Sequence, residues 1–405
     1  METADRGHSA SYVDDIFAAL SRNPDGEALI FGSRRMTAGE LCGLTHRLAR
    51  VLRMRGLGPG GTIALLSGNI PEALALRYAA YLVGCRITYL RHDLSAELHG
   101  LLLQSLGDHV LVVDPRYVDR AAELAALAPV KDMLLLGTEG LGDRLVPPGA
   151  EDVLRLAAFV SAEPFACLAP EDAVFSLLHT GGSTGHPKAV CHTAAQQVGF
   201  RRQLLALRPA GDRELLCTPL AAIGGYLADL ALLGGGTVVL LEGFQPAEVL
   251  EVIERQRVSG LFLPPPLLFA LMDHADVSWR DLSSLQHLLY GGCAAAPGRI
   301  AEALERFGPV LVQVYGQTES GLITALAVED HNPRRPELLR SVGKPMPGVQ
   351  VAVRDTSGHD LSPGTVGEVC VRSDLVMGGL LQTPRAHRGR HPRRLAAHRG
   401  PWPFG

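Results

Sequence analysis

The sequence has no CxxC pair, no excess of charge of one sign and no secretory signal. Its seven cysteines are scattered over 405 residues, which argues against a disulfide framework or a cysteine zinc site. They favour reduced thiols in a cytoplasmic protein. The formal net charge of -4 gives no reason to expect nucleic acid or an anionic membrane as a partner. The N-terminus METADRGHSASYVDDIF is polar and carries early acids, unlike a secretory signal.

The sequence also lacks a convincing membrane span. The best candidate, residues 220–241, contains Asp229 and five glycines and is broken at GGG. We therefore expect a helix over LADLALL followed by a buried strand over TVVLL, and no membrane span.

Apolar strands alternate with amphipathic helices through most of the chain. TIALLS, PEALALRYAAYLVG and RITYL form one such unit; HVLVV, DRAAELAALA and DMLLLG a second; TVVLLEG, PAEVLEVIERQRV and GLFLP a third. This βαβ rhythm predicts an α/β fold with parallel-rich sheets in two subdomains, residues 1–170 and 171–340. Residues 341–379 are rich in Gly and Pro and predict a small β-barrel or meander without a helix.

A segment rich in glycine and hydroxyl residues, HTGGSTGHPKA, spans residues 179–189. Its backbone can approach a phosphate closely, and its N–H and O–H groups can donate to the oxygens. Lys188 adds a mobile positive charge. The segment is not a Walker A loop, which requires Gly-Lys-Ser/Thr, because Pro187 precedes the lysine and Ala189 follows it. Alone, it is also compatible with an ordinary turn. The small and hydroxyl residues are Thr180, Gly181, Gly182, Ser183, Thr184 and Gly185.

A second segment, VYGQTES, spans residues 314–320 and follows the strand-like PVLVQV. Ligands of α/β sheets bind at the carboxyl ends of strands. There Tyr315 could stack on a base, Thr318 could donate to a phosphate, and Glu319 could ligate Mg²⁺. Alone, this segment too is compatible with an ordinary turn.

Together the two segments resemble the adenylate-forming superfamily of acyl-CoA synthetases, luciferases and nonribosomal adenylation domains. The family pattern TSGTTGxPKG is matched by residues 180–189, YGxTE by residues 315–319, and the adenine-facing GG by Gly291 and Gly292. The resemblance runs from about residue 10 to about residue 379. It implies the fold of the large N-terminal domain of these enzymes.

The resemblance implies a two-step reaction with ATP, Mg²⁺ and coenzyme A. A carboxylate attacks the α-phosphate to give acyl-AMP and pyrophosphate, and the thiol of coenzyme A or of a carrier protein then displaces AMP. Preorganised donors and a divalent cation stabilise the charge that builds up in the first step. By resemblance Lys188 and the phosphate loop hold the β- and γ-phosphates, Thr318 contacts the α-phosphate, and Glu319 holds Mg²⁺. Further nucleotide contacts are expected from Gly291, Gly292, Tyr315 and Gly316.

The segment TPLAAIGGY departs from the family pattern PLxH. Ala222 stands where a histidine lines the acyl tunnel, which is compatible with a neutral replacement or with an altered tunnel. The segment also lacks the acid that holds an α-amino group, because Asp229 lies seven residues too late unless the alignment slips. We expect an apolar pocket for a carboxylate with an alkyl or aryl body. The expected substrate-contacting residues are Ala222, Gly224, Gly225, Tyr226, Cys293 and Ala294.

After the glycine pair that corresponds to Gly378 and Gly379 here, the family continues with a ribose-binding TGD turn and a C-terminal domain that carries a catalytic lysine. Such a domain needs on the order of 100 residues, and about 25 follow Gly379. We therefore expect that the C-terminal domain is absent. One hypothesis is a ligase core that works weakly or is complemented by a C-terminal domain in trans. The other is a pseudoenzyme or gene remnant that binds nucleotide without turnover.

Residues 385–405 hold six arginines, three histidines and no acid. They are compatible with a disordered basic tail. They are also compatible with a frameshift, because a one-base shift permits DGWLxTGDLG over residues 393–402, the ribose-binding turn of the family. We favour the frameshift and expect residues 380–405 to lack a fixed fold and adenylation to be impaired. The nucleotide sequence tests this directly.

Overall fold

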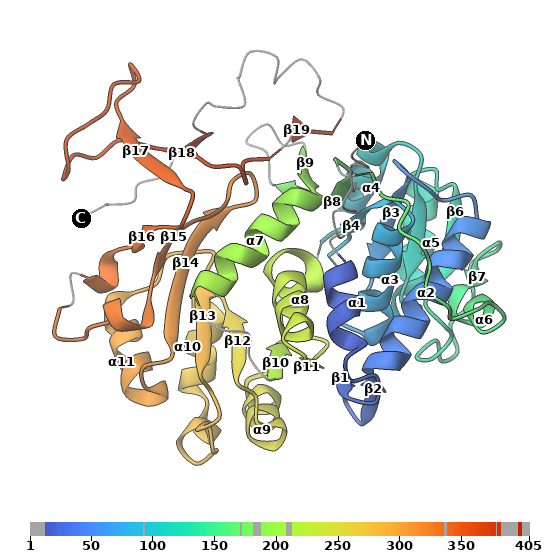
Figure 1. Ribbon diagram of the computed structural model, residues 1–405, viewed down its shortest axis with the longest axis horizontal. Coiled ribbons are helices and arrows are strands. Elements are labelled where there is room, and N and C mark those ends of the chain that lie inside the picture. The colour runs from blue at the N-terminus through green and yellow to red at the C-terminus, as the bar shows by residue number, and fades with distance from the viewer. Residues whose placement is uncertain are drawn as a thin grey trace, which may run out of the picture.

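Two large sheets and one small sheet organise the chain in the computed structural model (Figure 1). The structure describes residues 13–91, 94–170, 172–180, 188–207, 213–335, 338–377, 379–381 and 396–398.

The first large sheet has eight strands, and the chain enters it twice, first for β3 to β9 and later for β19. Its central strands are buried along their whole length, which explains their continuous apolar sequences. The strand pairs at the centre of this sheet are parallel. The two pairs at one edge, β8–β9 and β9–β19, are antiparallel. In spatial order the strands are β19 (Gly379–Leu380), β9 (Lys188–Thr193), β8 (Val174–Thr180), β4 (Arg86–Tyr89), β3 (Thr62–Leu66), β5 (Val110–Val113), β6 (Asp132–Leu135) and β7 (Glu151–Asp152).

The second large sheet has nine strands and is parallel at its centre. Antiparallel pairs close both edges: β1–β2 at one and β14–β15–β16 at the other. In spatial order the strands are β16 (Lys344–Pro345), β15 (Gly321–Leu326), β14 (Leu311–Gln317), β13 (His287–Gly291), β12 (Gly260–Leu263), β10 (Arg213–Leu216), β11 (Thr237–Leu240), β1 (Glu27–Phe31) and β2 (Arg34–Thr37).

Local sequence signals fix the starts of several helices. A reciprocal capping box of Thr37 and Glu40 begins α2, and a proline occupies the first turn of α3, α9, α10 and α11. The helices are α1 (Asp14–Leu20), α2 (Ala38–Met54), α3 (Pro71–Leu82), α4 (Ala96–Leu106), α5 (Val118–Leu127), α6 (Val153–Ala157), α7 (Ala194–Leu207), α8 (Gly225–Leu233), α9 (Pro246–Gln256), α10 (Pro265–Asp273) and α11 (Pro297–Phe307).

Helices α3 and α8 lie between the two large sheets and are joined by a buried ion pair (Figure 1). Arg77 of α3 donates twice to the Asp229 carboxylate of α8, at 2.7 and 3.1 Å. The Tyr78 hydroxyl donates to the same carboxylate at 2.8 Å. Arg77 is 4% exposed and Asp229 is fully buried. Two charges removed from water are tolerated here because each compensates the other with good geometry.

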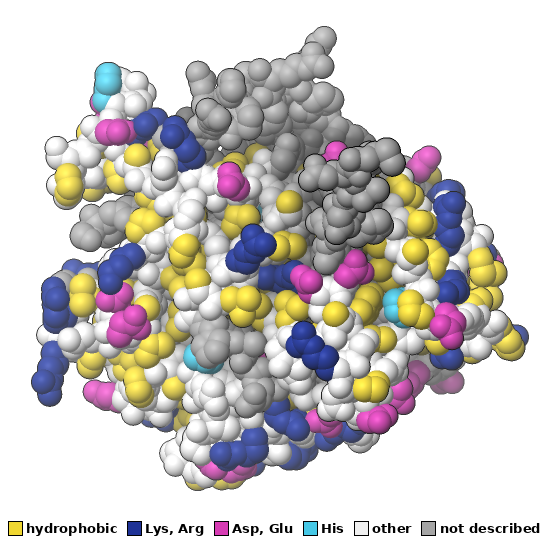
Figure 2. Space-filling model, viewed as in Figure 1, with side chains coloured by type: hydrophobic (Ala, Val, Ile, Leu, Met, Phe, Trp, Pro, Cys, Tyr) yellow, Lys and Arg dark blue, Asp and Glu magenta, His cyan; other side chains and the backbone are white. Residues whose placement is uncertain are grey.

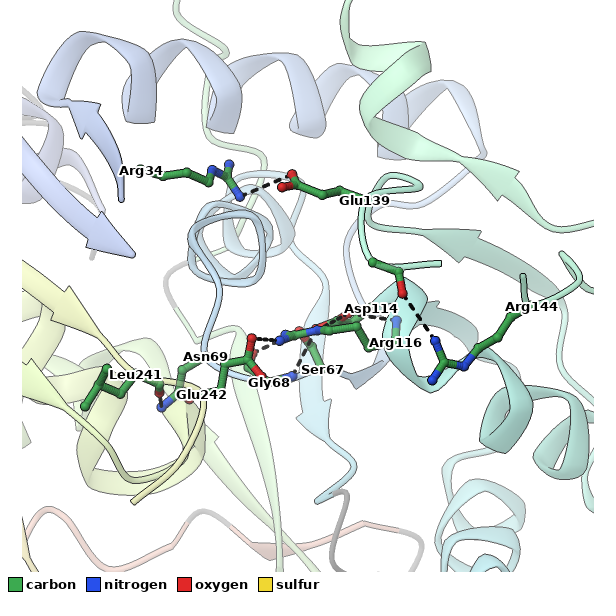
Figure 3. Close-up of polar contacts among 11 residues, drawn as sticks. Arg34, Ser67, Gly68, Asn69, Asp114, Arg116, Glu139, Arg144, Leu241 and Glu242 are labelled. Atoms are coloured by element: carbon green, nitrogen blue, oxygen red, sulfur yellow. Dashed lines mark hydrogen bonds and ion pairs between the residues drawn. The ribbon is translucent and has the colours of Figure 1, made fainter. Parts of the chain in front are cut away.

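Asn69 joins the carboxyl ends of the two sheets (Figure 3). It follows β3, and its buried amide donates to the carbonyls of Thr218 and Leu241 at 2.9 and 3.0 Å. Its side-chain oxygen accepts from the Leu220 amide at 3.0 Å. The amide therefore fixes the loops that follow β10 and β11 against the end of β3.

An ionic link lies beside this amide (Figure 3). Arg116, which follows β5 of the first sheet, donates to the buried Asp114 carboxylate at 2.9 Å and pairs with Glu242 of the second sheet. Asp114 also raises the pKa of Arg116 through its hydrogen bond, which keeps the guanidinium charged. Asn69 and Arg116 together hold the seam between the sheets.

The predicted α/β fold with parallel-rich sheets is confirmed, and the strands and helices of the three βαβ units form as expected. The predicted boundary at residue 170, however, does not separate the two sheets. Strands β8 and β9 belong to the first sheet, whereas β1 and β2 belong to the second. The order of the strands along the chain could not predict which sheet each strand joins, because β1 pairs with β11, which is far away in the sequence.

The C-terminal segment forms a three-stranded sheet of β17 (Gln350–Arg354), β18 (Glu368–Arg372) and β20 (Ala396–His398). It is antiparallel, as in the meander expected for residues 341–379. Residues 380, 381 and 396–398 differ from the expected absence of a fixed fold. Leu380 pairs with Val190 of β9, the Leu381 amide donates to the Ala189 carbonyl, and the backbone of residues 396–398 pairs with β18. Apart from residues 380, 381 and 396–398, the tail prediction lies outside the described residues.

Residues 220–241, the best candidate for a membrane span in the sequence, contain the helix α8 and the strand β11, as expected. Within the part of the chain that the structure describes, no helix is long and apolar enough to cross a membrane. Basic and acidic side chains are interspersed on the face shown in Figure 2.

Replacing Asp229 by alanine should destabilise the fold, because Arg77 would remain buried without its partner. We expect Asp229→Ala to lower the free energy of unfolding by about 3–5 kcal/mol. The double variant Arg77→Met/Asp229→Leu removes both charges and should recover most of that loss. Denaturant unfolding at pH 7 measures both, and equal losses in the two variants would contradict this interpretation of the pair.

Candidate active site

The predicted phosphate loop connects two neighbouring strands of the first sheet. The backbones of Thr180, at the end of β8, and Lys188, at the start of β9, are register partners. This pairing places the two ends of the loop side by side at the carboxyl end of β8. The side chains of Thr180 and Lys188 lie outside the described structure, as do Gly181, Gly182, Ser183, Thr184 and Gly185.

The second predicted segment lies at the carboxyl end of β14 in the other sheet. Tyr315 and Gly316 are in β14, and Thr318 and Glu319 form the turn into β15. The predicted GG segment is adjacent, because β13 ends at Gly291, whose register partner is Val314 of β14. The residues that two separate motifs predict to face the nucleotide therefore lie together at the carboxyl ends of β13 and β14. Ligands of α/β sheets bind at this end of the strands.

Gly291 allows an unusually close approach of β13 and β14. A Cβ atom at this position would lie 2.1 Å from the Val314 carbonyl oxygen, which no larger residue could accommodate without moving the strand. The next residue, Gly292, has φ +90°, a conformation that favours glycine. The glycine pair is thus required by the backbone itself, and it leaves the strand ends open beside Tyr315.

The loop strand and the Glu319 turn, though on different sheets, are brought together by main-chain contacts. The amide of Met377 donates to the Glu319 carbonyl at 2.7 Å, and the amide of Leu381 donates to the Ala189 carbonyl at 2.9 Å. Gln196, at the start of α7, donates to the Val376 carbonyl at 2.6 Å. The segment that contains Val376, Met377 and β19 therefore bridges the two predicted motifs.

His192 lies in β9, four residues after Lys188, and is 5% exposed. Burial lowers its pKa, while the nearby Glu319 charge acts in the opposite direction. The strand that leaves the phosphate loop thus passes near the turn that carries the proposed metal ligand.

The residues near Glu319 fit a magnesium–nucleotide site. Among the described residues no cluster of three or more His, Cys, Asp or Glu side chains could hold a metal ion by itself. Mg²⁺ bound with nucleotide takes one or two protein carboxylates and fills its other positions with phosphate oxygens and water. The single carboxylate of Glu319, half-buried at the strand end, matches that donor set.

The predicted substrate residues fall into a buried and an exposed group. Gly224, Gly225 and Tyr226 are buried at the start of α8, whereas Cys293 and Ala294 are exposed after β13. Ala222 lies in the π-helical turn Leu220–Gly224, and its side chain lies outside the described structure.

Tyr226 forms a wall between α7 and α8. Its ring stacks on Phe200 with centroids 4.1 Å apart. Burial raises the pKa of Tyr226, so the phenol stays neutral. The stacked rings of Phe200 and Tyr226 make this wall largely apolar.

A cavity of about 230 Å³ lies at the seam of the two sheets, next to the Ala222 turn. Leu220, Ala221 and Leu267 line one part of it. Its other part is lined by Ser67, Gly68, Asn69, Tyr89, Leu90, Arg91, Cys217, Thr218, Pro219, Glu242, Gly243 and Phe244. The seam that joins the sheets is therefore also hollow.

Asp229 does not serve as a substrate-binding acid. Its carboxylate accepts hydrogen bonds from Arg77 and Tyr78 and has no exposed surface. The alternative in which a slipped alignment places it against a substrate amine is therefore wrong. The signal was present in the sequence, since an acid within the apolar run GYLADLALL requires a buried partner.

Sequence reasoning missed two residues that organise the site: Asn69 and Gln196. Each is a polar side chain buried next to a motif, and each donates to the backbone of a segment distant in sequence. Their polarity within buried segments was visible, but the partners were not, because those partners are main-chain groups brought together only by the fold.

Stability should fall in mild acid because of His179, the residue before Thr180. Thr88 gives its only hydroxyl proton to the Leu177 carbonyl and so accepts from His179 Nδ1, 3.1 Å away. Burial lowers the pKa of His179 from 6.5 to about 4. The unfolded chain therefore takes up this proton first, and stability should decrease as the pH falls from about 6.5 to about 4.

The full effect of this one group is at most about 3 kcal/mol. Urea unfolding of the parent and of His179→Gln between pH 7 and pH 4 measures it. Between pH 7 and pH 4, the free energy of unfolding should decrease less in the variant than in the parent. Identical slopes for the two proteins would show that the histidine titrates normally.

Comparison with known proteins finds a family match over most of the chain. The family described as AMP-binding enzyme matches residues 16–381. The medium/long-chain-fatty-acid–CoA ligase of Mycobacterium tuberculosis is 37% identical over 375 residues, 91% of this chain and 65% of that protein. A feruloyl-CoA synthase of Amycolatopsis is 30% identical over 90% of this chain and 70% of its own length.

Among solved structures, the amide bond synthetase McbA of Marinactinospora thermotolerans superposes with a TM-score of 0.82. The two are 36% identical, over 93% of this chain and 72% of that one. The chain thus spans 65% of the length of the mycobacterial ligase and somewhat more of the other two proteins.

Proposed function

The chain belongs to the AMP-binding enzyme family, and on that premise we propose that it binds ATP with Mg²⁺ and activates a carboxylic acid as its acyl-adenylate. The acceptor in the second step is the thiol of coenzyme A or of a carrier protein. The observation that supports this most strongly is the pair of main-chain hydrogen bonds that Met377 makes to Glu319 and Leu381 makes to Ala189, which bring the phosphate-loop strand β9 and the Glu319 turn together. A cytoplasmic location is part of the same proposal.

The proposed roles follow the positions of the residues. Lys188 and the loop before it hold the β- and γ-phosphates, and Thr318 contacts the α-phosphate. Tyr315 and the Gly291–Gly292 pair receive the adenine at the edge shared by β13 and β14. Glu319 would hold Mg²⁺, which would neutralise phosphate charge as pyrophosphate departs.

The proposed substrate is a carboxylic acid with an alkyl or aryl body and no α-amino group. The Ala222 turn and Tyr226 offer an apolar wall, and Asp229 is already neutralised by Arg77. An ammonium group would lose its hydration in such a pocket without gaining an ionic partner, which is costly. The mycobacterial relative is named as a fatty-acid ligase and the Amycolatopsis relative as a feruloyl-CoA synthase.

Lys188→Ala should weaken ATP binding about 10- to 100-fold, because charge-assisted phosphate contacts contribute about 1.5–3 kcal/mol. Glu319→Ala should abolish the dependence of ATP binding on Mg²⁺. Titration calorimetry with and without Mg²⁺ measures both effects. Lys131→Ala and Glu123→Ala, exposed changes on the first sheet and on α5, serve as matched controls that should bind as the parent does. Parent-like binding by both site variants would refute the site assignment.

Pyrophosphate release with ATP and a library of acids separates activation from nucleotide binding without turnover. We expect fatty or aryl acids to release pyrophosphate and amino acids to release little. A library in which amino acids are the better substrates would contradict the proposed pocket. ATP binding with no release for any acid would instead identify a nucleotide-binding protein without turnover.

A further inference from the structure

A buried cluster of three polar side chains lies directly behind the residues predicted to face the adenine. Tyr290 of β13 and Gln313 of β14 are register partners, one position before Gly291 in β13. The third member, His331, follows the short turn Val328–Asp330 that comes after β15. Tyr290 is fully buried, and Gln313 and His331 are 9% and 7% exposed. The cluster therefore joins β13, β14 and the chain that leaves β15.

The hydrogen bonds of this cluster have one consistent direction. A backbone carbonyl can only accept, so His331 Nδ1 carries a proton and donates to the Ala327 carbonyl at 2.7 Å. Burial lowers the pKa of His331, which keeps the ring neutral near pH 7 and leaves Nε2 as an acceptor. The Tyr290 hydroxyl therefore donates to His331 Nε2, 3.0 Å away. Gln313 Oε1 lies 3.4 Å from the same hydroxyl, which is a longer and weaker contact.

The strand ends beyond this cluster leave little room for movement. At the next position of β13, Gly291 approaches β14 so closely that a Cβ atom would lie 2.1 Å from a main-chain oxygen. A small shift of β13 against β14 would therefore change the space beside Tyr315. Strand β15 is held in turn, because buried Thr324, the register partner of Tyr315, donates to the Val342 carbonyl at 2.6 Å.

We propose that Tyr290 and His331 are positioning residues for the purine base. Their hydrogen bond fixes the end of β13 relative to β14, so that the slot formed by Gly291, Gly292 and Tyr315 exists before nucleotide binds. This inference rests on the proposed function, because it concerns how that nucleotide site receives adenine. A preorganised slot avoids the cost of ordering it on binding, so its loss should lower the affinity for ligands that carry the base.

The test measures dissociation constants for ATP and for inorganic tripolyphosphate, each with Mg²⁺, by calorimetry on the full chain. Tripolyphosphate offers the phosphates without the base. We expect Tyr290→Phe to weaken ATP binding about 3- to 10-fold, the range of one hydrogen bond, and to leave tripolyphosphate binding within about twofold of the parent. His331→Leu should weaken ATP binding by a similar factor. The double variant should bind ATP no more weakly than the weaker single variant, because either change breaks the same bond.

Tyr78→Phe is the matched control. Tyr78 is also fully buried, and its hydroxyl donates a single hydrogen bond, to Asp229 at 2.8 Å, but it lies on α3 between the two large sheets. Its loss should reduce stability without changing the affinity for ATP. His331→Gln retains an acceptor near the position of Nε2 and should return ATP affinity to within about twofold of the parent. It also serves if the leucine variant does not fold.

The outcomes are distinct. A parent that does not bind ATP with Mg²⁺ would refute the proposed function. A parent that binds, together with a Tyr290→Phe variant that is less stable but keeps the parental ATP affinity, would overturn the positioning role alone. The same follows if the two single effects multiply in the double variant, or if Tyr78→Phe weakens ATP binding as much as Tyr290→Phe does. Equal losses for ATP and tripolyphosphate would also overturn it, because the base would then not be what the hydrogen bond serves.

Discussion

The buried ion pair between Arg77 and Asp229 is the constraint on which the arrangement of the two large sheets depends. It joins α3, which connects strands of the first sheet, to α8, which precedes β11 of the second. Neither charge can reach water, so the two helices cannot slide or separate without exposing an unpaired ion to an apolar layer. A purely apolar contact at the same place would permit such movement at lower cost.

The seam at the strand ends follows from that constraint. With the helices fixed, Asn69 and Arg116 of the first sheet reach the loops after β10 and β11 of the second. The proposed nucleotide site is then divided between the sheets. One sheet supplies the strand that leaves the phosphate loop, and the other supplies the glycine pair, Tyr315 and the Glu319 turn. The main-chain hydrogen bonds of Met377 to Glu319 and of Leu381 to Ala189 connect the two halves at the point where the reaction is proposed to occur.

The local elements could be predicted from the sequence because their signals are local. The apolar run TIALL predicts β3, and the break at GGG separates α8 from β11. The two motifs also marked the correct strand ends. Sheet membership could not be predicted, since β1 pairs with β11 some two hundred positions away. The apolar run around Asp229 indicated that it needs a buried partner, but the sequence could not identify the partners, Arg77 and Tyr78, which lie on a helix that connects strands of the first sheet.

A structure of the chain with ATP and Mg²⁺ tests the central claim most directly, namely that both sheets contribute to one nucleotide site. The account predicts phosphate oxygens within hydrogen-bonding distance of Lys188 and Thr318, a cation on the Glu319 carboxylate, and adenine beside Gly291 and Tyr315. A nucleotide held by one sheet alone, or bound away from the Glu319 turn, would contradict it.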